Sequence, residues 1–330
     1  QLAGPLPYLM PGKGSPDQPC GILFPLPLDV VYTEDGMAHT LMLRLADPSR
    51  HSSRMPALAV SPVPARKEQA AGFLTEAGMK AYLNGKLSSE HSVVAWTKLF
   101  EEEYRIGVEL SPAANSAVHG RLYAATHARP DARFRILAWT GLKSPVNDEA
   151  EKLDSLGALV IGGEQRMARL TRDFIVPPPL TPLCPDIPES SGPVVIKWSL
   201  ATSGVFAHGW LPGWCRDSTA LSRPEGRVCL KLAKGRAHLI AACLGKPVPF
   251  AGWDMVRGES KPTQFAVPAG SVYYFLCEDT ATAREFAILL HWRPRSDSYG
   301  EKGFGHGFAS HHPASPDILK LADSLFKSEK

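Results

Sequence analysis

The chain is organised around the stretch Ala158-Leu159-Val160-Ile161-Gly162-Gly163-Glu164-Gln165-Arg166-Met167-Ala168-Arg169-Leu170. An apolar run that stops at a glycine pair is typical of a strand ending in a turn, because glycine allows positive φ and a close approach of the backbone. Arg166 and Arg169 follow the turn, and the guanidinium fork fits phosphate or carboxylate. The stretch predicts either an anion site or a strand end with solvated charges.

The composition is that of an ordinary globular protein. The chain has 330 residues, 44% of them hydrophobic and 21% charged, with a formal net charge of +3. This length allows two domains, and so small a charge does not by itself require a nucleic acid. Local basic runs are more informative, because six Lys/Arg lie between Arg105 and Lys143 and six between Arg223 and Lys246. Such runs suit either a phosphate-bearing partner or solvated strand faces.

Cysteine usage and hydropathy indicate the cellular compartment in which the protein works. None of the six cysteines forms a CxxC or CxxH pair, which argues against a zinc ribbon. Most lie in apolar surroundings, as Cys277 does, and this usage fits a reducing cytoplasm. No apolar run reaches the roughly 18 residues of a membrane span. We expect a cytoplasmic protein without a metal, a cofactor or a membrane segment.

The first half predicts a strand-rich domain, residues 1–176. Dense proline in residues 1–28 predicts extended, irregular structure, and Pro48 to Pro64 predicts a loop. Alternation of apolar and polar residues from Tyr104 to Trp139 predicts strands, two of them joined as a long arm. The remaining predicted elements are a hairpin over residues 29–43, a helix over 68–83 and a helix over 149–156.

A proline-rich linker, residues 177–192, is expected before a second domain, residues 193–330. Ser315 caps a final helix that begins at Pro316. The element order predicts an α+β fold with a mainly antiparallel sheet and helices on one side. The strands predicted for this half lie at residues 194–200, 228–232, 238–244, 271–277 and 287–292.

The arm carries the first set of candidate functional residues. Arginine beside aromatic side chains can form a platform for single-stranded RNA, because bases stack while guanidiniums hold phosphates. A solvent-facing strand side explains the same pattern equally well. The candidates are Arg105, His119, Arg121, Arg133 and Arg135, with Tyr123 and Trp139 as stacking surfaces.

A glycine-rich segment, residues 300–308, supplies the second set. Its backbone amides can approach a phosphate chain, with Lys302 and His306 nearby. No GK[ST] and no strand-to-helix context are present, which excludes a nucleotide-binding P-loop. A mobile surface loop is the alternative. No GxSxG, HExxH or DxD motif is present either, so the sequence predicts no catalytic site.

Several motifs, in their order and spacing, resemble subunit three of the Cmr (type III-B) CRISPR effector complex, a family of the RAMP superfamily. In the first half these are Phe24-Pro25-Leu26-Pro27-Leu28-Asp29, Phe73-Leu74, Glu103-Tyr104-Arg105-Ile106-Gly107, Gly120-Arg121-Leu122-Tyr123 and Ile161-Gly162-Gly163-Glu164-Gln165-Arg166. In the second half they are Gly252-Trp253-Asp254, Lys261-Pro262-Thr263, Ala266 to Phe275 and Lys302-Gly303-Phe304-Gly305.

The resemblance implies two ferredoxin-like (RRM-type) RAMP domains without catalytic activity. It further implies binding of the 5′ tag of the CRISPR RNA and contact with a large polymerase/cyclase-like subunit and with backbone subunits, and so indirectly with target RNA. Together with the candidates above, it gives an expected RNA-binding set. That set is Arg105, His119, Arg121, Gly162, Gly163, Arg166, Arg169, Lys302, Gly303, Gly305 and His306.

One departure and two alternatives accompany this resemblance. The family opens with a strand and a helix that residues 1–28 do not supply, so we expect an incomplete first domain. The first alternative is a metal-independent endoribonuclease of the same superfamily that uses a histidine base. The second is a metabolic enzyme with an apolar pocket. The histidines considered for a base are His208, His238, His291, His306, His311 and His312.

Overall fold

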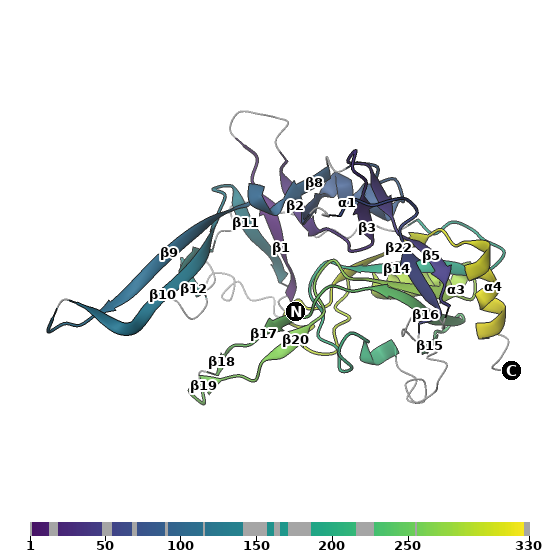
Figure 1. Cartoon of the computed structure of the whole chain (residues 1–330). Helices are drawn as coiled ribbons and strands as arrows, with labels where there is room; N and C mark the ends of the chain where they lie inside the picture. The colour runs from purple at the N-terminus through teal and green to yellow at the C-terminus, as the bar shows by residue number, and fades with distance from the viewer. Residues whose placement is uncertain are drawn as a thin grey trace.

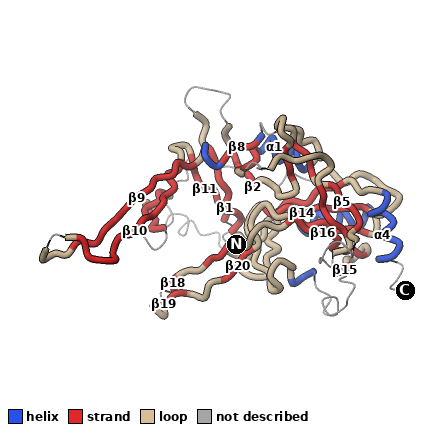
Figure 2. The backbone as a smooth tube through the Cα atoms, in the orientation of Figure 1, coloured by secondary structure: helices blue, strands red, loops and turns tan. Residues whose placement is uncertain are grey.

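Two five-stranded antiparallel sheets form the body of the protein (Figure 1). The structure, a computed structural model, describes residues 2–12, 19–47, 55–67, 71–89, 92–114, 116–140, 157–161, 166–170, 186–215, 228–254 and 256–326. Strands predominate in these residues, with three α-helices among them (Figure 2). The predicted α+β class is therefore confirmed. None of the described helices is long and apolar enough to cross a membrane.

The first sheet has the strand order β11-β1-β2-β7-β8. Its strands are β1 (Leu2–Leu9), β2 (Gly21–Pro25), β7 (Gly72–Thr75), β8 (Val93–Ala95) and β11 (Phe134–Thr140). The second sheet has the order β15-β16-β21-β14-β22. Its strands are β14 (Val194–Leu200), β15 (Val228–Lys231), β16 (Arg236–Cys243), β21 (Val272–Cys277) and β22 (Gly307–His312).

The prediction of irregular structure in residues 1–28 is wrong, because β1 and β2 lie there, and β1 runs along β11 inside the first sheet. β1 has a second partner, β2, only at Tyr8 and Leu9. Pro5 and Pro7 precede these residues, where one side of the strand has no partner, and proline is tolerated there because it lacks the N–H that a ladder needs. The expectation that residues 1–28 supply no first strand is wrong as well, because β1 lies within them.

Two hairpins follow β2. The hairpin predicted over 29–43 is confirmed in its first strand and turn, but β3 (Val30–Tyr32) pairs with β4 (Ala38–Thr40) and not with residues 41–43. The loop predicted from Pro48 to Pro64 instead contains β6 (Ala57–Val60), which pairs with β5 (Met42–Leu45). Leu43 and Ala57 of that hairpin belong to the core of the second sheet. Contacts thus cross the boundary predicted at residue 176, and the two-domain division stays a prediction.

Helix α1 (Glu76–Leu83) is shorter than the helix predicted over residues 68–83, because residues 72–75 form β7. It begins at a threonine cap, where the Thr75 hydroxyl accepts a hydrogen bond from the Gly78 N–H at 3.2 Å. Met79 and Tyr82 are buried against the first sheet. The helix predicted over 149–156 lies outside the described residues.

The second sheet is covered on both faces. Every residue of β14 is buried, including the polar Lys197 and Ser199. One face packs Trp198 and Phe275 against Phe286 of α3 (Thr280–Leu290). The strand predicted over 287–292 is therefore wrong for most of its length. Asp279 caps α3 by accepting from the Thr282 N–H at 2.7 Å, and the buried residues recur at helical spacing.

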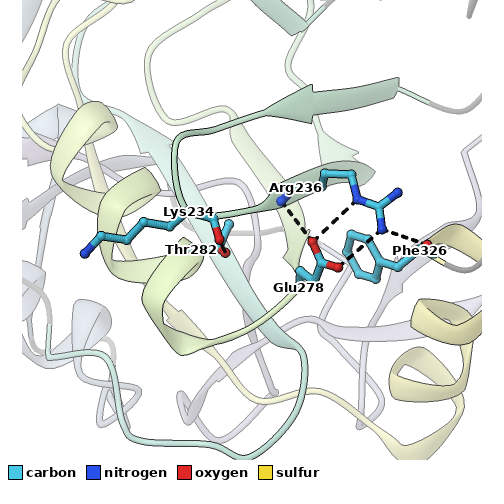
Figure 3. A network of polar contacts seen from close by, with 5 residues as sticks. All are labelled: Lys234, Arg236, Glu278, Thr282 and Phe326. Carbon is cyan, nitrogen blue, oxygen red and sulfur yellow. Dashed lines mark hydrogen bonds and ion pairs between the residues drawn. The ribbon is translucent and has the colours of Figure 1, made fainter. Parts of the chain in front are cut away.

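The opposite face of the second sheet carries α4 (Pro316–Phe326), the predicted final helix, so the prediction of helices on one side is wrong for this sheet. Its N-terminus is near the Ser315 hydroxyl, which accepts from the Ile318 N–H at 3.5 Å. Its C-terminus is held by Arg236 of β16, which donates to the Phe326 carbonyl at 2.7 Å and to the Glu278 carboxylate at 3.2 Å (Figure 3). A cation at a helix C-terminus also interacts favourably with the helix dipole.

A buried polar cluster joins the two halves. The carboxylate of Asp29, which precedes β3, accepts from the hydroxyls of Tyr82 at 2.7 Å and Tyr274 at 2.9 Å. Lys197 of β14 lies 3.6 Å from the same carboxylate and 3.6 Å from the centre of the Tyr82 ring. Aromatic contacts extend the junction, with Phe24 and Phe308 rings 5.4 Å apart. These contacts pack the two halves against each other.

The strand order β16-β21-β14-β22 is compatible with a ferredoxin-like sheet, in which two βαβ units interleave. The count of two such domains stays a prediction. The last part of the predicted linker packs on this sheet, because Ile187 belongs to its core and accepts from Arg284 of α3.

Candidate nucleic-acid interface

A long β-hairpin projects from the first sheet and is called the arm, residues 100–130. It consists of β9 (Phe100–Leu110) and β10 (Ala117–Pro130), which form a two-stranded sheet of their own and extend far from the body in Figure 1. The predicted arm is thus confirmed. Its cross-strand register pairs Arg105 with Ala125 and Glu103 with His127. Successive residues therefore face opposite sides of the ribbon.

One side of the arm is charged and internally neutralised. Glu103 accepts from Arg105 at 2.7 Å and from Arg129 at 2.8 Å, and these hydrogen bonds hold the pKa of Glu103 below its ordinary value. Arg121 lies 3.5 Å from Glu109. The arm contains three arginines against four glutamates. The predicted basic character is corrected: the run from Arg105 starts just after three consecutive glutamates that belong to the same strand.

The other side of the arm is apolar and exposed. Ile106 is 65% exposed and Leu122 is 70% exposed, and Tyr104, Val108 and Leu110 are exposed as well. Tyr123 belongs to the charged side instead, because it lies across from Gly107, where a Cβ would overlap its ring. The absence of a side chain at Gly107 thus leaves room for the Tyr123 ring.

The remaining first-half candidates are placed differently. His119 is exposed on the arm. Trp139, expected as a stacking surface, packs edge-on against Trp292 at 5.8 Å in the core between the halves, which corrects that expectation. Arg133 pairs with Asp131 at 3.2 Å, and Arg135 donates to the carbonyls of Ala132 and Phe134. Neither belongs to the arm.

The central stretch forms a separate hairpin. β12 (Ala158–Ile161) pairs antiparallel with β13 (Arg166–Arg169), so the expected strand that ends at the glycines is confirmed. Gly162 and Gly163 lie outside the described residues, as does the side chain of Arg166. Arg169 is exposed opposite Ala158.

The glycine-rich segment packs against the body, and its expected use of free amides is corrected. The amide N–H groups of residues 302–306 all donate within the chain, as in Gly305 to the Ser203 carbonyl at 2.8 Å and His306 to the Thr202 hydroxyl at 2.9 Å. His306 is only 2% exposed, and Gly303 and Gly305 are buried. Only Lys302 of this set is exposed, with its amine 4.6 Å from the Tyr299 ring centre.

A second projection was not predicted as a site. It is called the finger, residues 248–266, and contains β17 (Val248–Phe250), β18 (Trp253–Asp254), β19 (Glu259–Ser260) and β20 (Gln264–Ala266). The motifs Gly252-Trp253-Asp254 and Lys261-Pro262-Thr263 lie in it. Its strands are two or three residues long, too short for a clear alternation, but an isolated Trp among Gly, Asp and Lys is a usable sequence signal.

The six histidines considered for a base are all buried or half-buried. His238, His306 and His312 are buried. Burial lowers the pKa of His306, and burial with the nearby Lys197 charge lowers that of His312 to about 3. Within the described ranges no three His, Cys, Asp or Glu residues are grouped as metal ligands. Cys215 and Cys277 are buried, as expected of core residues.

Comparison with known proteins gives a family match that covers most of the chain. Residues 1–311 match the family model described as CRISPR-associated protein (Cas_Cmr3). No curated protein is detectably similar. Two similar solved chains come from cryo-EM structures of the Type III-B Cmr-beta bound to cognate target RNA, one of them also with AMPPnP in state 1.

Both similarities to solved chains are distant, at 12% identity and a TM-score of 0.41. They cover 83% of this chain but only 64% and 66% of the solved chains. The protein therefore spans slightly less than two thirds of the length of each.

Proposed function

Because the chain belongs to the Cas_Cmr3 family of CRISPR-associated proteins, we propose that it is a non-catalytic, RNA-binding subunit of a type III-B Cmr complex. In this role it holds the 5′ tag of the CRISPR RNA and joins the large polymerase/cyclase-like subunit to the backbone subunits. It would meet target RNA only through that assembly. The observation that carries the proposal is the extent of the family match, which runs through both sheets.

The arm supplies contacts of the kind that RNA binding needs. Arg105, His119 and Arg121 all lie on its exposed surface. The ion pairs of Arg105 and Arg121 with glutamates are solvent-exposed, and such pairs contribute little free energy. A phosphate can therefore replace the carboxylate as partner, since the guanidinium fork accommodates either anion. Arg169, exposed on the central hairpin, is a further cation for the same strand of RNA.

The junction between the halves supports a scaffolding role. Asp29, Lys197 and Tyr274 are fully enclosed and tie the first half to the second sheet. A subunit that positions one end of a guide RNA relative to its neighbours requires a fixed distance between its contact surfaces. A buried ion pair with two hydroxyl donors is geometrically demanding and favours one arrangement of the halves.

The test uses the full chain and two RNAs that differ only in the repeat-derived 5′ tag, one native and one scrambled, in the presence of EDTA. We expect tighter binding of the tagged RNA, strong salt dependence and intact RNA after incubation. Equal binding of both RNAs, together with equal assembly into the Cmr complex, would refute the role in tag recognition. Sharp, specific cleavage products would instead establish the metal-independent endoribonuclease as the function.

A further inference from the structure

The finger exposes two large aromatic side chains that the body of the protein does not cover. Trp253 is 57% exposed and Phe265 is 62% exposed. Exposing rings of this size to water is unfavourable, and grouped exposed apolar side chains usually mark a binding surface. Phe265 pairs with Pro249 in the register of β17 and β20, four positions before Trp253. At the rise of a strand this places the two rings about 13 Å apart along the finger.

The root of the finger is fixed by the glycine-rich segment. The Phe250 ring packs edge-on against Tyr299, with centres 5.7 Å apart, and lies tilted against Phe304, with centres 5.3 Å apart. Gly303 and Gly305, both at positive φ, make the bends that place Phe304 there. At Gly305 a Cβ would collide with the Ser296 backbone, so only glycine fits. The glycine-rich segment therefore fixes the position of the root of the finger.

The described residues at the tip of the finger are joined by hydrogen bonds. The Asp254 carboxylate accepts from the N–H groups of Val256 at 3.0 Å and Arg257 at 3.1 Å, and these bonds lower the pKa of Asp254. The Gly258 N–H donates to the Asp254 carbonyl at 2.8 Å, with Gly258 at a φ of +67°. The Asp254 carboxylate is thus engaged by backbone N–H groups inside the turn.

The finger is neutral in formal charge, whereas the arm carries a net negative charge. Residues 248–266 contain two Lys/Arg against two Asp/Glu, with Lys246 just before them, whereas the arm has three arginines against four glutamates. Lys261 makes no ion pair with any described residue, and Arg257 has only a long one, 3.8 Å from Glu259. These cations are available to phosphates, and phosphate neutralisation dominates the affinity of proteins for nucleic acids.

We propose that the finger is a stacking platform for single-stranded RNA. Trp253 and Phe265 stack on unpaired bases while Lys261 and Arg257 face the phosphates, a combination that tolerates any base sequence. The inference rests on the proposed function in taking RNA as the partner. It adds a second contact site, on the second half of the chain and separate from the tag-recognising surface assigned above.

The experiment measures binding of a labelled oligouridylate of about ten nucleotides to the full chain by fluorescence anisotropy. We expect W253A and F265L each to weaken binding roughly tenfold, since leucine keeps the apolar volume of phenylalanine but not its flat ring. V256A changes the most exposed side chain of the same finger without touching a ring, and should bind as the wild type does. K261Q should flatten the salt dependence by about one unit.

Photo-crosslinking of the same oligonucleotide gives a readout that does not depend on a variant folding correctly, and should label peptides within residues 248–266. Wild-type affinity of W253A and F265L, or crosslinks only outside the finger, would refute the stacking platform while leaving tag recognition intact. Equal affinity for a fully double-stranded RNA would also refute it, because paired bases present no free face. If the wild-type chain binds no RNA, the proposed function fails together with this inference.

Discussion

Asp29 and Tyr274 are 245 positions apart in the sequence, yet the Tyr274 hydroxyl donates to the Asp29 carboxylate at 2.9 Å in the interior of the protein. Tyr82 donates to the other carboxylate oxygen, and Lys197 completes the cluster. Burial lowers the pKa of Lys197 and raises those of both tyrosines. The cluster therefore holds one buried carboxylate whose partners come from both halves of the chain.

Replacing Asp29 by Asn should destabilise the protein strongly. The substitution keeps the size of the side chain but leaves the Lys197 ammonium buried without a counter-charge, which costs about 3–5 kcal/mol in comparable cases. The free energy of unfolding in urea measures the loss. The double variant D29N/K197M removes both charges and should lose less than the sum of the single variants D29N and K197M. Additivity of the two losses within about 0.5 kcal/mol would show that the residues do not interact.

Acid should destabilise the protein through His312. Its pKa is about 3 in the folded protein, against about 6.5 for an ordinary histidine, because it is buried and faces Lys197 and His311. Below a pH of about 6.5 the unfolded chain therefore binds a proton at His312 that the folded chain does not bind. The free energy of unfolding falls as the pH drops from about 6.5 towards 3.

The contribution of this single histidine has a maximum slope of about 1.4 kcal/mol per pH unit. His312→Phe keeps the ring that contacts Tyr274 at 5.0 Å and removes the titration. Unfolding free energies between about pH 7 and pH 5 should then fall less steeply, although the buried His306 and the half-buried His311 leave a residual slope. Parallel curves for the variant and the wild type would contradict this assignment.

Arg236→Ala should loosen the end of α4. The change removes the hydrogen bond to the Phe326 carbonyl and the ion pair with Glu278 (Figure 3). Bonds of this kind to a charged group are worth about 1.5–3 kcal/mol, and hydrogen exchange should accelerate in the last turn of the helix. Lys320→Ala is the matched control: Lys320 lies on the same helix and has only an exposed pair with Asp317. Equal losses for both variants would exclude a special role for Arg236.

Sequence patterns identified the helices and strands that are determined by residues close together in the sequence. The buried run of β14 and the Ser-Pro start of α4 were predicted correctly, because burial and capping leave their mark on neighbouring residues. β1 was missed since its prolines are tolerated only where a partner strand is absent, which depends on the whole sheet. α3 was predicted as a strand over its last residues because a short apolar run fits either structure.

The candidate site was predictable to a smaller extent, because its electrostatics depend on pairs across strands. The arm itself followed from alternation, but its arginines were assigned without their partners. Glu103 and Arg129 are 26 residues apart and meet only through the register of the hairpin. The glycine-rich segment was assigned to phosphate binding because glycine frees the backbone, whereas the structure engages those amides internally.

Replacing Glu103 by Gln should strengthen RNA binding if the charged side of the arm contacts phosphates. Glu103 holds both Arg105 and Arg129, so the neutral amide would release two guanidiniums and remove one negative charge. Affinity for RNA should rise, and the slope of log affinity against log salt should steepen by about one unit.

Glu102→Gln is the control for this change. It removes the same charge from the same strand, but Glu102 faces the apolar side of the ribbon and makes no ion pair with a described residue. A steeper slope in E103Q than in E102Q would assign the effect to the released arginines. Equal slopes would assign it to net charge alone, because long-range attraction depends on the sum of charges and not on which guanidinium is free. Unchanged affinity in both variants would place the RNA away from the charged side of the arm.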